Sequence, residues 1–130
     1  MRFHASRGGM SVGKSPNGLP PDSLVENEAA ILKDTQRVIE RYHDARHGSM
    51  LRVVIAPCSP FSVSQELMKQ SVTMARHYGV SIHTHLTEKD SGIRYSREKF
   101  NMMPAQYVED LGWVGPDVWH AYRGSWICTV

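Results

Sequence analysis

The chain has 130 residues, a net charge of +2, 41% hydrophobic residues and 22% charged residues, a balance that excludes a disordered or fibrous protein and is typical of one globular domain. Basic and acidic residues are interspersed, so no basic stripe predicts nucleic-acid binding, and no apolar run reaches the roughly 18 residues that would predict a membrane span. The two cysteines lack a disulfide or metal spacing and the start lacks a signal-peptide pattern, so we expect a cytoplasmic protein.

The first third of the chain predicts a strand, a loop and a helix. The opening MRFHA is a candidate strand, and residues 11–23 concentrate Gly, Pro, Asn and Ser, which is typical of a loop. Asp22 or Ser23 is expected to cap the following helix, with Glu26 completing a capping box. Apolar residues then recur at the helical period, and the helix is expected to stop near Gly48.

The rest of the chain alternates predicted strands and helices. These elements are a strand MLRVVIAP, a helix from Ser62 or Ser64 to Gly79, a strand GVSIHTHL, a helix from Pro104 to Gly112 and a strand DVWHAY. Such alternation indicates right-handed βαβ units and a parallel sheet. Four strands and three helices are half of a (β/α)₈ barrel or a small doubly wound sheet, and chain length does not choose between them.

Two histidines end the strand GVSIHTHL. Alternate strand residues share a face, so His83 and His85 are expected to point the same way. Parallel α/β folds bind ligands beyond the carboxyl ends of their strands, where His85 and Glu88 lie. An imidazole can bind zinc or ferrous iron, and a nearby carboxylate can transfer protons. Two histidines do not complete a metal site, so polar residues that cap a strand are the alternative interpretation.

Several segments resemble one protein family. The run HTHLTE resembles the strand-five motif of the amidohydrolase superfamily, in the branch that holds purine deaminases and triazine hydrolases. The segments RFHASRGGMSVGKSPNGLPPDSLVENE, VVIAPCSPFSVS and YSREKFNMMPAQYVEDLGWVGPDVWHA are similar to those of 8-oxoguanine deaminases, in order from Met1 to about Ala121. The resemblance implies a partial (β/α)₈ TIM-type barrel with about four parallel strands, strands three to six of the family, and their intervening helices.

The resemblance also implies a site and a reaction. His85 matches the family's metal ligand for one divalent ion, zinc or iron, and Glu88 matches its catalytic proton-transfer residue. His83 would support this site or join the metal, and Arg2 and His4 match a region that approaches the substrate. The implied reaction is hydrolytic deamination of an oxidised purine, 8-oxoguanine to urate and ammonia. A triazine-type aminohydrolase, or a non-catalytic remnant, is the alternative.

The chain departs from the family's pattern at several positions. The family's HxH pair on strand one and aspartate on strand eight have no counterpart, and its strand-six catalytic histidine is replaced by Tyr122. We expect residues 1–122 to form the partial barrel domain and residues 123–130 to be a tail unlike the family, as a shift of reading frame would produce. We therefore expect the isolated chain to be inactive and to hold metal weakly, whereas intact family members would be homo-oligomers.

Other candidate residues are expected to be structural. His43 and His47 are four apart on the first predicted helix and could share a face, but no third metal ligand is evident. His120, on the last predicted strand, is expected to be a core histidine with a hydrogen-bond partner. Cys58 has no histidine partner within its motif, so a small buried thiol is expected there rather than a nucleophile.

Overall fold

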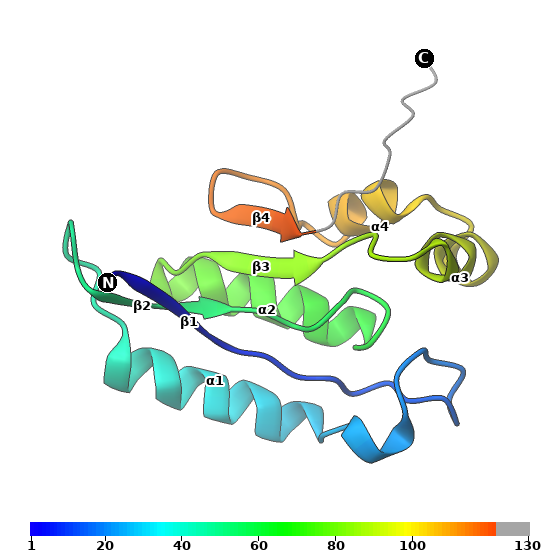
Figure 1. Cartoon of the computed structure of the whole chain (residues 1–130), viewed down its shortest axis with the longest axis horizontal. Coiled ribbons are helices and arrows are strands. Elements are labelled where there is room, and N and C mark those ends of the chain that lie inside the picture. Colours follow the sequence, from blue (N-terminus) through cyan, green and yellow to red (C-terminus); the bar gives the residue numbers. More distant parts are fainter. Residues whose placement is uncertain (122–130) are drawn as a thin grey trace.

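Four parallel strands form the centre of the computed structural model, which describes residues 1–121 (Figure 1). The strands are β1 (Phe3–Arg7), β2 (Leu51–Ile55), β3 (Ile82–His85) and β4 (Val118–Ala121), and they lie in the order β1-β2-β3-β4. Each crossover thus adds the next strand on the same side, as in a barrel, whereas a doubly wound sheet reverses its strand order at a switch point. The strand order is therefore that of a barrel segment and contains no switch point within the described residues.

Four α-helices and one short 3₁₀ helix connect these strands within the described residues. They are η1 (Asp22–Leu24), α1 (Glu28–Tyr42), α2 (Gln65–Tyr78), α3 (Asp90–Phe100) and α4 (Pro104–Asp110). Ser64 caps α2, Gly79 ends it in the left-handed conformation (φ 65°), and Pro104 is the first residue of α4, as predicted. None of these helices combines the length and the apolar content that crossing a membrane requires.

The first helix begins later than the sequence predicts. Its N-cap is Asn27, whose side-chain oxygen accepts the backbone N–H of the residue three positions on, at 3.1 Å. Asp22 instead accepts hydrogen bonds from the backbone N–H and the hydroxyl of Ser15, and Glu26 pairs with Arg7 at 2.7 Å. The predicted capping box at Ser23 and Glu26 is therefore wrong, because these acidic side chains have partners elsewhere in the fold.

The same helix also ends earlier, at Tyr42 rather than near Gly48. His43 is the C-cap residue, and its Nδ1 accepts the backbone N–H of Val53, in the middle of β2, at 3.0 Å. The expected placement of His43 and His47 on one helix is therefore wrong, and His43 serves to join the end of α1 to β2.

Helix α3 has no counterpart among the predicted elements. It lies between β3 and α4, at the end of the sheet toward which the strands run (Figure 1). Its first turn contains Gly92, which packs so closely on Phe61 that an added Cβ would lie 3.2 Å from the ring. The crossover from β3 to β4 therefore contains two helices instead of one.

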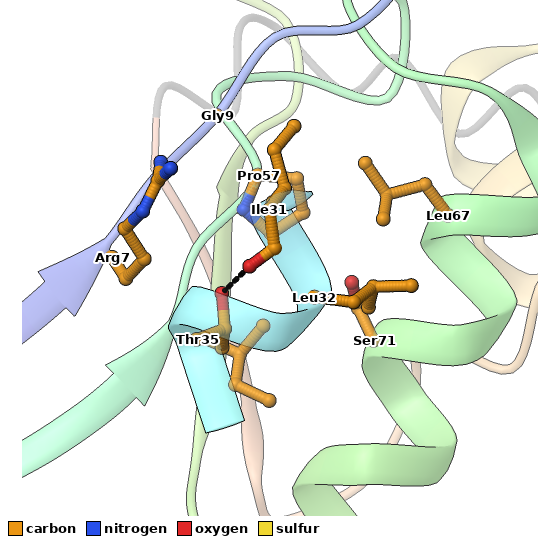
Figure 2. Close-up of a pocket in the computed structure, with 9 residues that line it drawn as sticks. Arg7, Gly9, Ile31, Leu32, Thr35, Pro57, Leu67 and Ser71 are labelled. Carbon is orange, nitrogen blue, oxygen red and sulfur yellow. Dashed lines mark hydrogen bonds between the residues drawn. The ribbon is translucent and has the colours of Figure 1, made fainter. Parts of the chain in front are cut away.

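The hydrophobic core lies between the sheet and helices α1, α2 and α4. Ile82 and Thr84 of β3 point into this core and are fully buried, and the hydroxyl of Thr84 donates to the Pro57 carbonyl at 2.9 Å. A cavity of about 10 Å³ remains on this side, where Thr35 donates to the carbonyl of Ile31 at 2.7 Å (Figure 2). This space is at the lower limit for one water molecule, so it is a packing gap rather than a ligand site.

Candidate active site

An open pocket of about 560 Å³ lies at the carboxyl edge of the sheet. Its lining comes from the segments that follow three strands: Met10 to Leu24 after β1, Cys58 to Ser62 after β2, and His85 to Gly92 around the end of β3. The volume is within the range of pockets that hold small organic ligands, and the location is the one at which parallel α/β proteins bind them.

The two histidines of β3 lie on the face of the sheet opposite the helices. Ile82 and Thr84 are buried, whereas His83 and His85 are partly exposed, and the two imidazole ring centres are 5.3 Å apart. The expectation that the histidines share one face is confirmed. The alternation also explains the sequence pattern, because only every second residue of β3 contributes to the core.

A backbone carbonyl fixes the orientation of the His85 ring. Its Nδ1 lies 3.1 Å from the carbonyl oxygen of Cys58, which also accepts the backbone N–H of His85 at 3.3 Å. A carbonyl oxygen can only accept, so the proton of the neutral ring is on Nδ1 and the lone pair is on Nε2. Histidines that bind metals are commonly oriented in this way, so His85 fits one position of a metal site.

His83 lies beside this ring and stacks on Trp119 of β4, with ring centres 5.0 Å apart and planes 23° apart. Burial lowers the pKa of His83, because an imidazolium ion is poorly solvated between these rings. The neutral ring of His83 packs edge-on against His85 and so limits the space available to it.

Glu88 is exposed and lines the same pocket as His85, so the fold brings these two predicted site residues together. Arg2 and His4 are exposed toward the amino end of β1 and do not line this pocket. The His4 ring lies 6.1 Å from that of Trp119. Tyr122 and the tail at residues 123–130 lie outside the described residues.

The sequence predicts a buried thiol at Cys58 and a core histidine at His120, but both side chains are only partly buried and Cys58 lines the pocket. Cys58 is half-buried, and desolvation raises the pKa of its thiol, which opposes formation of a nucleophilic thiolate. Nε2 of His120 lies 3.3 Å from the carbonyl oxygen of Trp113, on the helix side of β4. Sequence reasoning missed the Cys58 carbonyl and the apolar residues between Met10 and Leu24 as parts of the pocket.

The described residues do not form a complete metal site by themselves. Among residues 1–121, no three His, Cys, Asp or Glu side chains gather closely enough to hold a metal ion. Structural and catalytic zinc sites have three or four protein ligands. His85 therefore fits as one ligand of a divalent ion, and the described residues do not supply the remainder.

These features define a segment of a β/α barrel with a pocket formed by an imidazole, a carboxylate and apolar side chains at its carboxyl edge. The model of the amidohydrolase family matches residues 1–119. The chain belongs to the amidohydrolase family.

Two curated relatives match almost the whole chain. The 8-oxoguanine deaminase of Pseudomonas aeruginosa is 38% identical over 122 residues, which cover 94% of this chain and 27% of that protein. The hydroxydechloroatrazine ethylaminohydrolase of a Pseudomonas species is 39% identical over 122 residues, which cover 94% of this chain and 25% of that protein. The chain therefore spans about a quarter of the length of these relatives.

Solved structures agree with this assignment. The atrazine chlorohydrolase of Arthrobacter aurescens, complexed with zinc, superposes with a TM-score of 0.86 at 32% identity, covering 92% of this chain and 26% of that one. An adenosine deaminase of Xanthomonas campestris with bound zinc superposes with a TM-score of 0.75 at 12% identity, which shows the shared fold.

Proposed function

We propose that the chain carries one part of the active site of a hydrolytic deaminase that acts on an oxidised purine, with 8-oxoguanine as the reference substrate. The observation that carries this proposal is the pairing of His85 with Glu88 around one pocket at the carboxyl edge of the sheet. Membership of the amidohydrolase family and the 38% identity to an 8-oxoguanine deaminase support the reaction class.

The two residues have different roles in this proposal. His85, held by the Cys58 carbonyl, would bind a divalent zinc or iron ion through Nε2. Such an ion, when bound, lowers the pKa of a water molecule and makes it nucleophilic at neutral pH. The carboxylate of Glu88 takes one proton from the attacking water and delivers it to a ring nitrogen, while the hydroxyl adds to the carbon that carries the amine. The remaining proton of that hydroxyl then passes to the amine, which leaves as ammonia as the C–N bond breaks and the carbonyl forms.

For the chain by itself we propose no appreciable turnover. His85 is one ligand, and residues 1–121 gather no group of three that could hold the metal. We expect no ammonia above background when the purified chain is incubated with 8-oxoguanine or guanine and zinc. Robust ammonia release that is abolished by Glu88→Gln would contradict this expectation.

A positive test places the chain in a complete barrel. Residues 1–121 would replace the matching quarter of the Pseudomonas aeruginosa 8-oxoguanine deaminase. We expect this chimera to deaminate 8-oxoguanine, and His85→Ala or Glu88→Gln to lower kcat/KM at least about 100-fold, because the first change removes a proposed metal ligand and the second a proposed proton-transfer group. Glu98→Gln, on the exposed side of α3, is the matched control. Undiminished activity of a folded Glu88→Gln chimera would refute the assigned role.

A second candidate function is triazine aminohydrolysis. It is favoured by the 39% identity to hydroxydechloroatrazine ethylaminohydrolase and by superposition on an atrazine chlorohydrolase. Comparison of the chimera with the parental deaminase separates the two candidates, because residues 1–121 are the only difference between them. We expect the chimera to keep the parental preference in kcat/KM for 8-oxoguanine over hydroxydechloroatrazine. A shift of that preference toward hydroxydechloroatrazine would favour the triazine substrate.

A further inference from the structure

We propose that the segment from Met10 to Leu24, called here the β1 loop, is a preformed apolar wall that contacts the flat face of a bound heterocycle. We also propose that Asp22 is the positioning residue that holds this wall. The inference rests on the proposed function, because it assigns a substrate contact to the same pocket.

The β1 loop presents apolar side chains to the pocket. Leu19, Pro20, Pro21 and Leu24 line it, and Leu19 and Leu24 are 40% and 54% exposed. Phe61 and Leu86 add further apolar surface from the neighbouring segments. Small-molecule pockets are mostly apolar, with a few polar groups that fix the ligand's orientation. In this pocket the leucines of the loop are suited to apolar contact with a ligand, and His85 and Glu88 are suited to fixing its orientation.

Internal hydrogen bonds hold the middle of the loop. The carboxylate of Asp22 accepts the backbone N–H of Ser15 at 3.0 Å and its hydroxyl at 2.5 Å. The N–H of Gly18 donates to the carbonyl of Gly13 at 2.7 Å. A Cβ added at Gly13 would overlap the Asp22 carboxylate, and one added at Gly18 would overlap the Val12 carbonyl. The loop is therefore closely packed on itself without a ligand.

Further bonds join the loop to the rest of the pocket. The backbone N–H groups of Ser11 and Val12 donate to the carbonyl of Ser62 at 2.8 and 3.0 Å. Two residues beyond the loop, Glu26 pairs with Arg7 at the end of β1. Because the loop is fixed before a ligand arrives, little conformational entropy is lost when a ring packs on its leucines, and binding is stronger for that reason.

The chemistry of the wall indicates the class of ligand. Leucine and proline side chains offer dispersion contacts and no hydrogen bonds, so they suit the face of a flat ring rather than its polar edge. The edge of the same ring would then point toward His85 and Glu88. A planar purine or a related heterocycle satisfies both requirements.

The test measures binding of hypoxanthine, a soluble planar oxopurine, by saturation-transfer NMR with the full chain at low micromolar concentration. We expect the double variant Leu19→Ser/Leu24→Ser to raise Kd about tenfold, which corresponds to the apolar area that two leucines would bury. Val114→Ser is the matched control, because Val114 is also exposed (51%) but does not line the pocket. Circular dichroism checks that each variant is folded.

Asp22 is tested with two further variants. Asp22→Ala removes both acceptors of Ser15 and should weaken hypoxanthine binding, whereas Asp22→Asn keeps one acceptor oxygen and should restore most of it. The thermal unfolding midpoint should be the same for both variants, because Asp22 and its hydrogen bonds with Ser15 are exposed. Equal weakening by Asn and Ala would overturn the positioning role.

Glu88→Ala separates failure of the wall from failure of the proposed function. If Glu88→Ala weakens hypoxanthine binding but the double leucine variant binds normally, the wall is refuted and the proposed site stands. If neither change affects binding, or if hypoxanthine does not bind, the wall is refuted, and the chimera decides the proposed function separately. Weakening by both changes, with the Val114→Ser control unchanged, supports the wall.

Discussion

Cys58 lines the same pocket as His85, and burial makes its thiol less reactive. The thiol is half-buried, and desolvation, the largest influence, raises its pKa, although a hydrogen bond with Ser62 opposes this. A raised pKa means that less thiolate is present at any pH below it, and the thiolate is the reactive form.

We therefore expect iodoacetamide to alkylate Cys58 more slowly at pH 8 in the folded chain than in urea. The folded rate should continue to rise with pH beyond the range in which an ordinary cysteine titrates, because the folded pKa is the higher one. The measurement uses the Cys128→Ser variant, so that one thiol reacts. A folded rate at pH 8 equal to the unfolded rate would show that desolvation is unimportant.

At the scale of single residues, local sequence predicts part of the site. The period of the strand placed His83 and His85 on one face, and the position of His85 at the strand's end put it near Glu88. The carbonyl of Cys58 and the leucines of the β1 loop could not be predicted in this way, because their contacts join segments that are far apart in the chain.

At the scale of elements, the N-terminus of α1 provides a direct comparison between two candidate caps. Asn27 accepts an N–H of the helix, whereas Ser23 lies in the separate 3₁₀ helix η1. We expect Asn27→Ala to lower the free energy of unfolding by about 1 kcal/mol, the usual contribution of a cap. Ser23→Ala should change it by less than about 0.5 kcal/mol, as exposed sites do. Urea denaturation measures both, and equal losses would contradict the observed cap.

Gly92 in α3 is the second test at this scale. Helix propensity alone predicts that Gly92→Ala stabilises an exposed helix by about 1 kcal/mol. Here the new methyl group would lie 3.2 Å from the ring of Phe61, which is packed between Tyr95 and Tyr107. We expect a net loss of stability in urea denaturation, with Glu98→Ala on the same helix as the control. A gain of stability would show that the Phe61 ring moves aside.

The same glycine explains why the sequence did not reveal α3. A glycine and two serines weaken the helical pattern of DSGIRYSREKF, and the helix forms because its inner face packs on Phe61 and on α4. By contrast, α2 and α4 carry local signals in Ser64 and Pro104, which is why their starts were predicted correctly. Helices that depend on tertiary packing are those that local patterns miss.

At the scale of the whole molecule, the sheet has two open edges, β1 and β4, within the described residues. Phe3 on β1 is 54% exposed and Trp119 on β4 is 40% exposed. Unpaired strand edges with apolar side chains promote association between chains. We therefore expect the isolated chain to be marginally stable and to associate as its concentration rises.

Phe3→Lys should reduce this association, because a charged side chain on an edge strand opposes pairing with another chain. Val114→Lys adds the same charge at an exposed apolar residue outside the sheet and should have little effect. Light scattering as a function of concentration measures both variants. A monomeric parent chain with one sharp, cooperative thermal transition would contradict the expectation.

The consecutive strand order also has a consequence for synthesis on the ribosome. Since β2 pairs with β1, β3 with β2 and β4 with β3, each strand after β1 meets a partner that has already been translated. Nascent chains fold from the N-terminus, so the sheet can grow in step with translation. When recombination transfers a gene segment whose boundaries fall between strands, the segment keeps the pairs among all the strands that it encodes. This fold is therefore suited to the exchange of groups of consecutive strands by recombination.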